Sequence, residues 1–180
     1  MATTAADAQG DSPITDFSQC HVGIVAQLDA LDSLPALLLP AQRARQTAAT
    51  TLAFFDEVIL DHHAQEEKAL FPAVLASATP GAERDTVAAT INRLTAEHRR
   101  IEAHWGALKA ALRQVARGHD AALDADAVTQ LVQDYRAHAA YEEKEFLPLS
   151  QTILGRNANH MAALGISLHM RHVKPVAGYI

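Results

Sequence analysis

Apolar residues recur at every third or fourth position along four long stretches of the chain. This spacing places them on one face of an α-helix, which turns once every ~3.6 residues, and the polar residues between them fall on the opposite face. The pattern predicts helices that begin near Thr15 or Asp16, near Gln42, near Glu83, and near Asp124 or Asp126.

Proline and glycine residues mark where these helices are expected to end. Proline lacks the N–H that a helix interior needs, and glycine is the usual residue just past a helix C-terminus. The expected boundaries are Pro35 and Pro40 for the first helix, Pro72 and the turn 79–81 for the second, Gly118 for the third and Gly155 for the fourth.

Four long helices joined by short turns form an antiparallel bundle with an up-down-up-down course. We therefore expect an all-α fold in which residues 15–155 form a four-helix bundle. Residues 1–14 are expected to form a flexible tail, and residues 156–180 a second tail that contains a short helix packed on the bundle.

One sequence pattern occurs twice, as His-x3-Glu-Glu-Lys-x3-Pro, beginning at His62 and again at His138. Residues four apart on a helix lie on the same face, so each copy can turn an imidazole and a carboxylate toward one point. The pairs are His62 with Glu66 and His138 with Glu142. Each pair is half of a possible metal site.

Two further histidines precede the copies, His21 by 41 residues and His98 by 40 residues. In the expected bundle, residues at equal distances from a turn lie at the same level. His62 and His98 each lie 18 residues from Pro80, His98 and His138 each lie 20 residues from Gly118, and His21 and His62 lie 19 and 22 residues from Pro40. The spacing therefore predicts one histidine from each helix at a single level.

Four imidazoles and two carboxylates inside an apolar bundle are costly to bury without partners, and metal ions satisfy all six. We expect two ions with bridging carboxylates, and an oxo or hydroxo bridge that leaves one coordination position open. Nitrogen and oxygen ligands suit iron, manganese or zinc, and the carboxylate bridges favour iron. The predicted ligands are His21, His62, Glu66, His98, His138 and Glu142. The alternative is a plain helical bundle with surface histidines.

Other residues are less informative. His63 follows His62 by about 100° around the helix and is expected to be solvated or at a helix boundary, like His104 and His119. Cys20 is interpreted as a small buried or half-buried residue, with a redox-sensitive thiol as the alternative. The tail histidines His160, His169 and His172 are assigned to the short helix, with a second metal site as a remote alternative.

Glu102 lies four residues after His98 and is expected to point toward the same site. It is an additional ligand, a proton relay, or a solvated or salt-bridged side chain. The corresponding position after His21 is Val25, so the duplication is broken here.

The repeated motif and the spaced histidines resemble the hemerythrin-like family, in the subgroup of HHE cation-binding domains, over roughly residues 17–154. The resemblance implies a four-helix bundle with a non-haem di-iron centre and places ligands at the six residues named above. Oxygen-carrying members have a third-helix histidine where this chain has Glu102, and a last-helix aspartate where it has Glu143. The resemblance therefore favours a role other than reversible oxygen carriage.

Composition narrows the possible partners and location. The formal net charge of −6 and estimated pI near 5.9 provide no basic field for nucleic acid. The first 13 residues lack the basic and apolar parts of a targeting signal, and no uninterrupted apolar run approaches the ~20 residues that span a bilayer. A single cysteine fits the reducing cytoplasm. We expect a cytoplasmic protein without a nucleic-acid or membrane partner.

Two functions follow from these observations. In the first, the protein binds or reduces dioxygen, peroxide or nitric oxide at an open iron position, in oxygen handling or in oxidative or nitrosative stress. In the second, it is a non-catalytic iron or oxygen sensor, or an iron-binding protein, that acts through a protein partner. A structural bundle with an incidental site is the third possibility.

Overall fold

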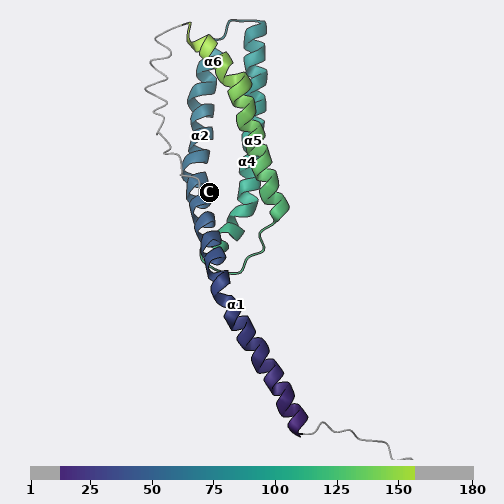
Figure 1. The fold of residues 1–180 in the computed structure, drawn as a ribbon. Helices are drawn as coiled ribbons and strands as arrows, with labels where there is room; N and C mark the ends of the chain where they lie inside the picture. Colours follow the sequence, from purple (N-terminus) through teal and green to yellow (C-terminus); the bar gives the residue numbers. More distant parts are fainter. Residues whose placement is uncertain (1–12, 157–180) are drawn as a thin grey trace, which may run out of the picture. The chain divides into compact units, whose positions relative to one another are not determined.

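The computed structural model describes residues 13–156, and the side chains of residues 19–156 (Figure 1). The described residues are helical apart from turns and contain no strand, so the expected all-α class is confirmed. The chain divides into two compact units, residues 1–44 and residues 45–180. The short helix expected in the C-terminal tail lies outside the described residues.

Helix α1 covers Pro13–Phe54 and runs through both Pro35 and Pro40, so the helix end expected at these prolines is wrong. An interior proline costs about 3 kcal/mol, but its fixed φ near about −65° is itself helical. The residues between the prolines are alanine and leucine, which have the highest helix propensities. A helical φ and favourable neighbours therefore let the helix continue where the missing N–H predicted a break.

The first unit exposes its apolar side chains. Every residue from 19 to 44 is exposed, and Cys20 is exposed as well, so the expectation that Cys20 is at least half-buried is wrong. The exposed large apolar residues of this unit are Val22, Ile24, Val25, Leu28, Leu31, Leu34, Leu37, Leu38 and Leu39.

Within the described residues, one helical stretch, Gln19–Ser77, contains a window long and apolar enough to cross a membrane, and none of that window is buried. A core helix of a soluble protein or an N-terminal signal meets the same criterion of length and composition. The property is weak support for a membrane span, and the absence of a membrane partner stays a prediction.

Between residues 45 and 156, the described part of the second unit, three helical segments lie side by side (Figure 1). The first continues from α1, the second is a single helix, and the third follows a loop that contains Gly118. Their bounds are η1 Phe55–Ile59, α2 Leu60–Gln65, η2 Glu66–Leu70 and α3 Phe71–Ser77; then α4 Ala82–Ala116; then α5 Ala125–Tyr141, η3 Glu142–Phe146 and α6 Leu147–Leu154.

The connections between the segments have the residues that their geometry requires. Gly81 and Gly118 have φ values of 101° and 77°, a region that favours glycine because it has no Cβ. Asp124 caps α5, since its side chain accepts hydrogen bonds from the backbone N–H groups of Asp126 and Ala127. The expected turns near residues 79–81 and at Gly118 are confirmed, as is the expected start of a helix at Asp124.

Two apolar clusters form the core of this unit. The first cluster consists of Phe71, Val74, Ala78, Val87, Leu94, Phe146, Ile153 and Leu154. The second consists of Phe55, Ile59, Ile101, Trp105, Leu108 and Leu131. Along each segment, residues 62–66, His98 and residues 138–142 fall between the positions that the two clusters occupy. The clusters thus lie on either side of the polar residues of the repeat.

The second cluster has a polar edge that fixes its aromatic pair. The rings of Phe55 and Trp105 stack with centroids 4.1 Å apart. Trp105 Nε1 donates to Asp56 at 3.1 Å, and Lys109 Nζ donates to the same carboxylate at 2.7 Å. The hydrogen bond from Lys109 is the largest influence on Asp56 and lowers the pKa of that carboxyl group. These contacts tie the start of the first segment to α4.

Truncation of the first cluster tests this core. Leu94 is fully buried, so Leu94→Ala removes packing and leaves a cavity. We expect the free energy of unfolding to fall by about 2–5 kcal/mol, measured by urea denaturation followed by circular dichroism. Val132→Ala, at a position 41% exposed on α5, is the matched control and should change it by less than about 0.5 kcal/mol. Equal effects of the two substitutions would contradict this description of the core.

Candidate metal centre

Three buried histidines from the three segments of the second unit meet at one point. His63 lies on α2, His98 on α4 and His138 on α5, and each is at most 1% exposed. The rings of His63 and His98 stack with centroids 3.9 Å apart, and the ring of His138 stands edge-on 4.8 Å from that of His98. One nitrogen of each lies within 4.8 Å of one nitrogen of the others. This arrangement is compatible with shared coordination of a cation.

The two glutamates of the repeat each begin a π-helical turn. Pro72 and Pro148 cannot donate a backbone hydrogen bond, and the helix preceding each of these two prolines departs from α geometry. In both copies it forms a π turn, in which the N–H of Phe71 bonds the carbonyl of Glu66 and the N–H of Leu147 bonds that of Glu142. Such turns are frequent at functional sites. A π turn that starts at the glutamate thus precedes the proline in both copies of the motif.

The carboxylate of Glu66 lies between two imidazoles. Its Oε1 is 3.3 Å from Nε2 of His62, and its Oε2 is 3.3 Å from Nε2 of His98. Glu142 approaches Nε2 of His138 at 3.7 Å. Ligand atoms of His62, Glu66 and Glu142 also lie within 4.8 Å of one another. Two groups of possible ligands therefore lie side by side, with Glu66 in contact with a histidine of each.

Each buried histidine directs its outer ring nitrogen at a carboxylate. Nδ1 of His98 is 2.8 Å from Glu67, Nδ1 of His63 is 3.3 Å from Glu102, and Nδ1 of His138 is 3.3 Å from Glu97. An ionised carboxylate only accepts, so these contacts favour the neutral ring that carries its proton on Nδ1; at His98 the contact of Nδ1 with Glu67, at 2.8 Å, is shorter than the contact of Nε2 with Glu66, at 3.3 Å. Nε2 is then left with its lone pair, which is the form that binds a metal.

Among the described residues, the inward-facing atoms have no hydrogen-bond partner. These buried atoms are Nε2 of His63, His98 and His138, Oε2 of Glu66 and Oε1 of Glu142. An unpaired polar atom costs several kcal/mol when it is buried, by roughly 2–7 kcal/mol for an uncharged group. Cations bound by the two groups of ligands would satisfy these atoms. The residues present therefore fit a metal site.

The electrostatics of the site also favour a cation. Burial and the neighbouring charge of Glu66 raise the pKa of Glu142 to about 9. Burial acts in the same upward direction on Glu66, but its contacts with His98, Glu142 and His62 outweigh burial and lower the pKa of Glu66 to about 2. Burial and the nearby His98 lower the pKa of His63 to about 4. At neutral pH the two glutamates therefore share one proton, which a bound cation could replace.

The structure brings five of the six predicted ligands together, namely His62, Glu66, His98, His138 and Glu142. The sixth, His21, lies on α1 in the other unit, and its part in the site stays a prediction. Glu102 lies against the outer nitrogen of His63, with its other oxygen 2.8 Å from Arg99. Its role as a proton relay or additional ligand is likewise still a prediction.

His63 is the residue that the sequence pattern misplaced. It was expected to be solvated, but it is buried at 1% exposure, whereas the side chain of His62 is 47% exposed. The π turn at Phe55–Ile59 inserts one residue into the helix and shifts the inward face by one position. The four-residue spacing of Phe55, Ile59 and His63 was a sequence signal for this register. The same expectation was made for His104 and His119. His119 is exposed as expected, and His104 is half-buried against Asp134.

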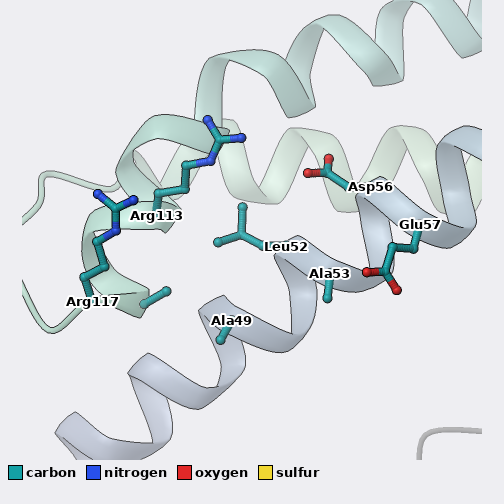
Figure 2. A pocket seen from close by; sticks show the side chains of 8 residues that line it. Ala49, Leu52, Ala53, Asp56, Glu57, Arg113 and Arg117 are labelled. Atoms are coloured by element: carbon teal, nitrogen blue, oxygen red, sulfur yellow. The ribbon is translucent and has the colours of Figure 1, made fainter.

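A cavity elsewhere in the second unit is distinct from this site (Figure 2). It has an apolar floor and two arginines on one side. Its lining residues are Ala49, Leu52, Ala53, Asp56, Glu57, Arg113, Ala116 and Arg117. None of them is a predicted ligand, so this cavity is not the candidate metal centre.

Comparison with known protein families matches residues 12–150 to the hemerythrin HHE cation-binding domain. No curated protein and no solved structure matches the chain.

Metal uptake should be coupled to proton release. Glu142 holds a proton below a pKa of about 9 and must lose it to act as an anionic ligand. Zn²⁺ binding to the metal-free protein should therefore release protons at pH 7, and the affinity should rise by about tenfold per pH unit for each proton released. Calorimetry in buffers of different ionisation enthalpy measures this release.

Glu142→Gln is the matched variant, because the amide keeps the shape of the side chain and has no proton to lose. Its Zn²⁺ affinity should be lower and should depend less on pH between 6 and 9. Equal proton release by the two proteins would show that Glu142 is not the source.

Proposed function

Because the chain belongs to the hemerythrin HHE cation-binding domain family, we propose that it is a non-haem di-iron protein that binds or reduces dioxygen, peroxide or nitric oxide. The imidazole and carboxylate ligands suit iron, with manganese or zinc as substitutes. The physiological setting is oxygen handling or the response to oxidative or nitrosative stress, in the cytoplasm.

The position of Glu66 is the observation that carries this proposal. Its two oxygens face different imidazoles, those of His62 and His98, at the same distance of 3.3 Å. A carboxylate in this position can bridge two ions, one on each side. His63, His98 and His138 would hold the first ion, and His62 with Glu142 would contribute to the second.

The proposal includes the complete four-helix bundle. We propose that residues 15–35 supply its fourth helix and that His21 is the remaining ligand, for the ion that His62 holds, which requires the continuous helix α1 to bend at Pro35 and Pro40. In support, the His62 group offers fewer imidazoles than the buried group, and its histidine is the more exposed one. An imidazole from another part of the chain would balance the two groups.

A bound iron pair would supply redox chemistry and an open coordination position, and aromatic side chains of the chain lie beside the buried histidines. The ring of Phe71 lies 5.9 Å from that of His98, and the ring of Tyr135 lies 6.0 Å from that of His138. Burial and the charges of Glu142 and Glu66 raise the pKa of Tyr135, so its hydroxyl keeps its proton at neutral pH. Two aromatic rings therefore lie beside the buried histidines.

A second function, a non-catalytic iron or oxygen sensor, is favoured by a different observation. The first unit exposes large apolar residues on one helix, and contiguous exposed apolar surface is typical of protein–protein contact. In this alternative, occupancy of the site is transmitted to a protein partner and no turnover occurs. Steady-state reduction of peroxide or nitric oxide by the iron-loaded protein distinguishes the two, because a sensor would bind the ligand without turnover.

The iron content of the protein tests the proposed centre. Protein from iron-supplied cells should contain close to two ions per chain, since the ligands exceed what one ion needs. Glu66→Ala removes the proposed bridge and should lower the content to one ion or fewer, and His21→Ala should lower it toward one. Elemental analysis by mass spectrometry measures the metal content.

Glu145→Ala is the control for Glu66→Ala, because the side chain of Glu145 is 48% exposed and pairs with Lys144 in the second copy of the motif. It should leave the metal content unchanged. Wild-type protein that contains no metal and cannot be reconstituted with iron would refute the proposal.

Glu102 provides a test of proton delivery. Glu102→Gln preserves the shape of the side chain and removes its titratable proton, so it should keep the metal but slow peroxide or dioxygen reduction and shift its pH dependence. Stopped-flow kinetics across pH 5 to 9 measure both effects. An unchanged rate and pH profile would mean that Glu102 is no relay.

A further inference from the structure

One arginine connects the outer nitrogens of two of the buried histidines. Arg99 contacts Glu67 through Nη2 and donates from Nη1 to Glu102 at 2.8 Å. The second oxygen of Glu67 lies 2.8 Å from Nδ1 of His98, and the second oxygen of Glu102 lies 3.3 Å from Nδ1 of His63. The chain of contacts runs from His98 through Glu67, Arg99 and Glu102 to His63.

The two histidines at the ends of this chain stack on each other. Their rings are 3.9 Å apart and within 6° of parallel. The contacts on the two Nδ1 atoms orient both Nε2 atoms inward. If either ring adopted the other tautomer, its N–H would point at the cation position and could not bind the ion. The metal site therefore requires the same tautomer in both rings.

A guanidinium group suits this connection better than an ammonium group. Its planar fork presents several N–H groups in fixed directions and can bond two carboxylates at once. Each carboxylate uses one oxygen for the arginine and the other for a histidine, so neither can rotate without breaking a contact. A lysine at position 99 would supply the charge without the fixed geometry.

The third buried histidine has a separate set of contacts. Nδ1 of His138 contacts Glu97, whose other oxygen accepts a hydrogen bond from Arg93 Nε at 2.8 Å. Arg93 in turn lies 3.5 Å over the ring of Tyr141. Arg93 is thus linked through a carboxylate to one histidine, whereas Arg99 is linked through two carboxylates to two histidines. The side chains of these arginines are similarly exposed, 53% and 55%, which makes them a matched pair.

We propose that Arg99 is a positioning residue that fixes the ring orientation and tautomer of His63 and His98 together, through Glu102 and Glu67. Its effect on metal affinity rests on the proposed function, but its effect on the histidine tautomers does not. Because Arg99 is half exposed, its replacement leaves no buried cavity.

The tautomers of the metal-free protein provide the direct test. Long-range ¹H–¹⁵N NMR spectra distinguish the two tautomers of each imidazole. Burial lowers the pKa of His98, but contacts with Glu66 and Glu67 outweigh burial and raise it, so the spectra are recorded at pH 8.5 to observe neutral rings. In the wild type, His63, His98 and His138 should all carry the proton on Nδ1.

The substitutions should separate the two sets of contacts. Arg99→Met should give mixed tautomers at His63 and His98 and leave His138 unchanged. Arg93→Met should affect His138 alone. Arg99→Lys keeps the charge and should restore the tautomers only in part. Circular dichroism checks that each variant is folded, and Arg99→Lys provides the test if Arg99→Met is not.

Metal affinity is the second measurement. Partners of ligating histidines typically change affinity by about 10–100-fold, so Arg99→Met should weaken Zn²⁺ binding by at least about tenfold. Folded Arg99→Met protein with the wild-type tautomers at both histidines would overturn the proposal. If the tautomers change but the wild type binds no metal, the positioning role of Arg99 stands and the proposed di-iron function fails.

Discussion

The burial of unpaired ligand atoms at one point is the constraint on which the second unit depends. Three imidazole nitrogens and two carboxylate oxygens face one another without hydrogen-bond partners among the described residues. Taken alone, this arrangement is unfavourable, and the two apolar clusters on either side of it help to hold it in place. A metal ion would turn this cost into a source of stability, because binding energy for a buried site is also folding energy.

The outer nitrogens of the buried histidines, by contrast, have partners, and these contacts limit the free-energy cost of burying the rings. Every buried histidine has a carboxylate beside Nδ1, and each of these carboxylates, Glu67, Glu102 and Glu97, also contacts an arginine that reaches solvent. The arginines thus offset the negative charge of the carboxylates that contact the outer nitrogens of the histidines. The inner atoms keep their lone pairs for a ligand, while the outer atoms are paired. An ordinary protein core differs, because almost all of its buried polar atoms are paired.

Both copies of the repeated motif contain a change in helix geometry as well as possible metal ligands. Pro72 and Pro148 remove one backbone donor from each helix, and each of these prolines lies just after a π turn that begins at the glutamate. The same kind of turn at Phe55–Ile59 shifts the face of the helix that carries His62 and His63. Local backbone irregularity therefore decides which of two adjacent histidines is buried. The family match over residues 12–150 supports the interpretation that this arrangement binds a cation.

The sequence by itself determined the all-helical class, the turns near residues 79–81 and at Gly118, and the two histidine–glutamate pairs. These features depend on local propensity and on four-residue spacing, which a sequence displays directly. The structure, and not the sequence pattern, shows that α1 continues through Pro35 and Pro40, because two local effects compete there, a proline penalty of about 3 kcal/mol and the helix propensity of the neighbouring residues. Only the tertiary structure buried His63 and linked it to His98 through Arg99, because a single π turn rotates all later side chains, and side chains on different helices meet only after packing.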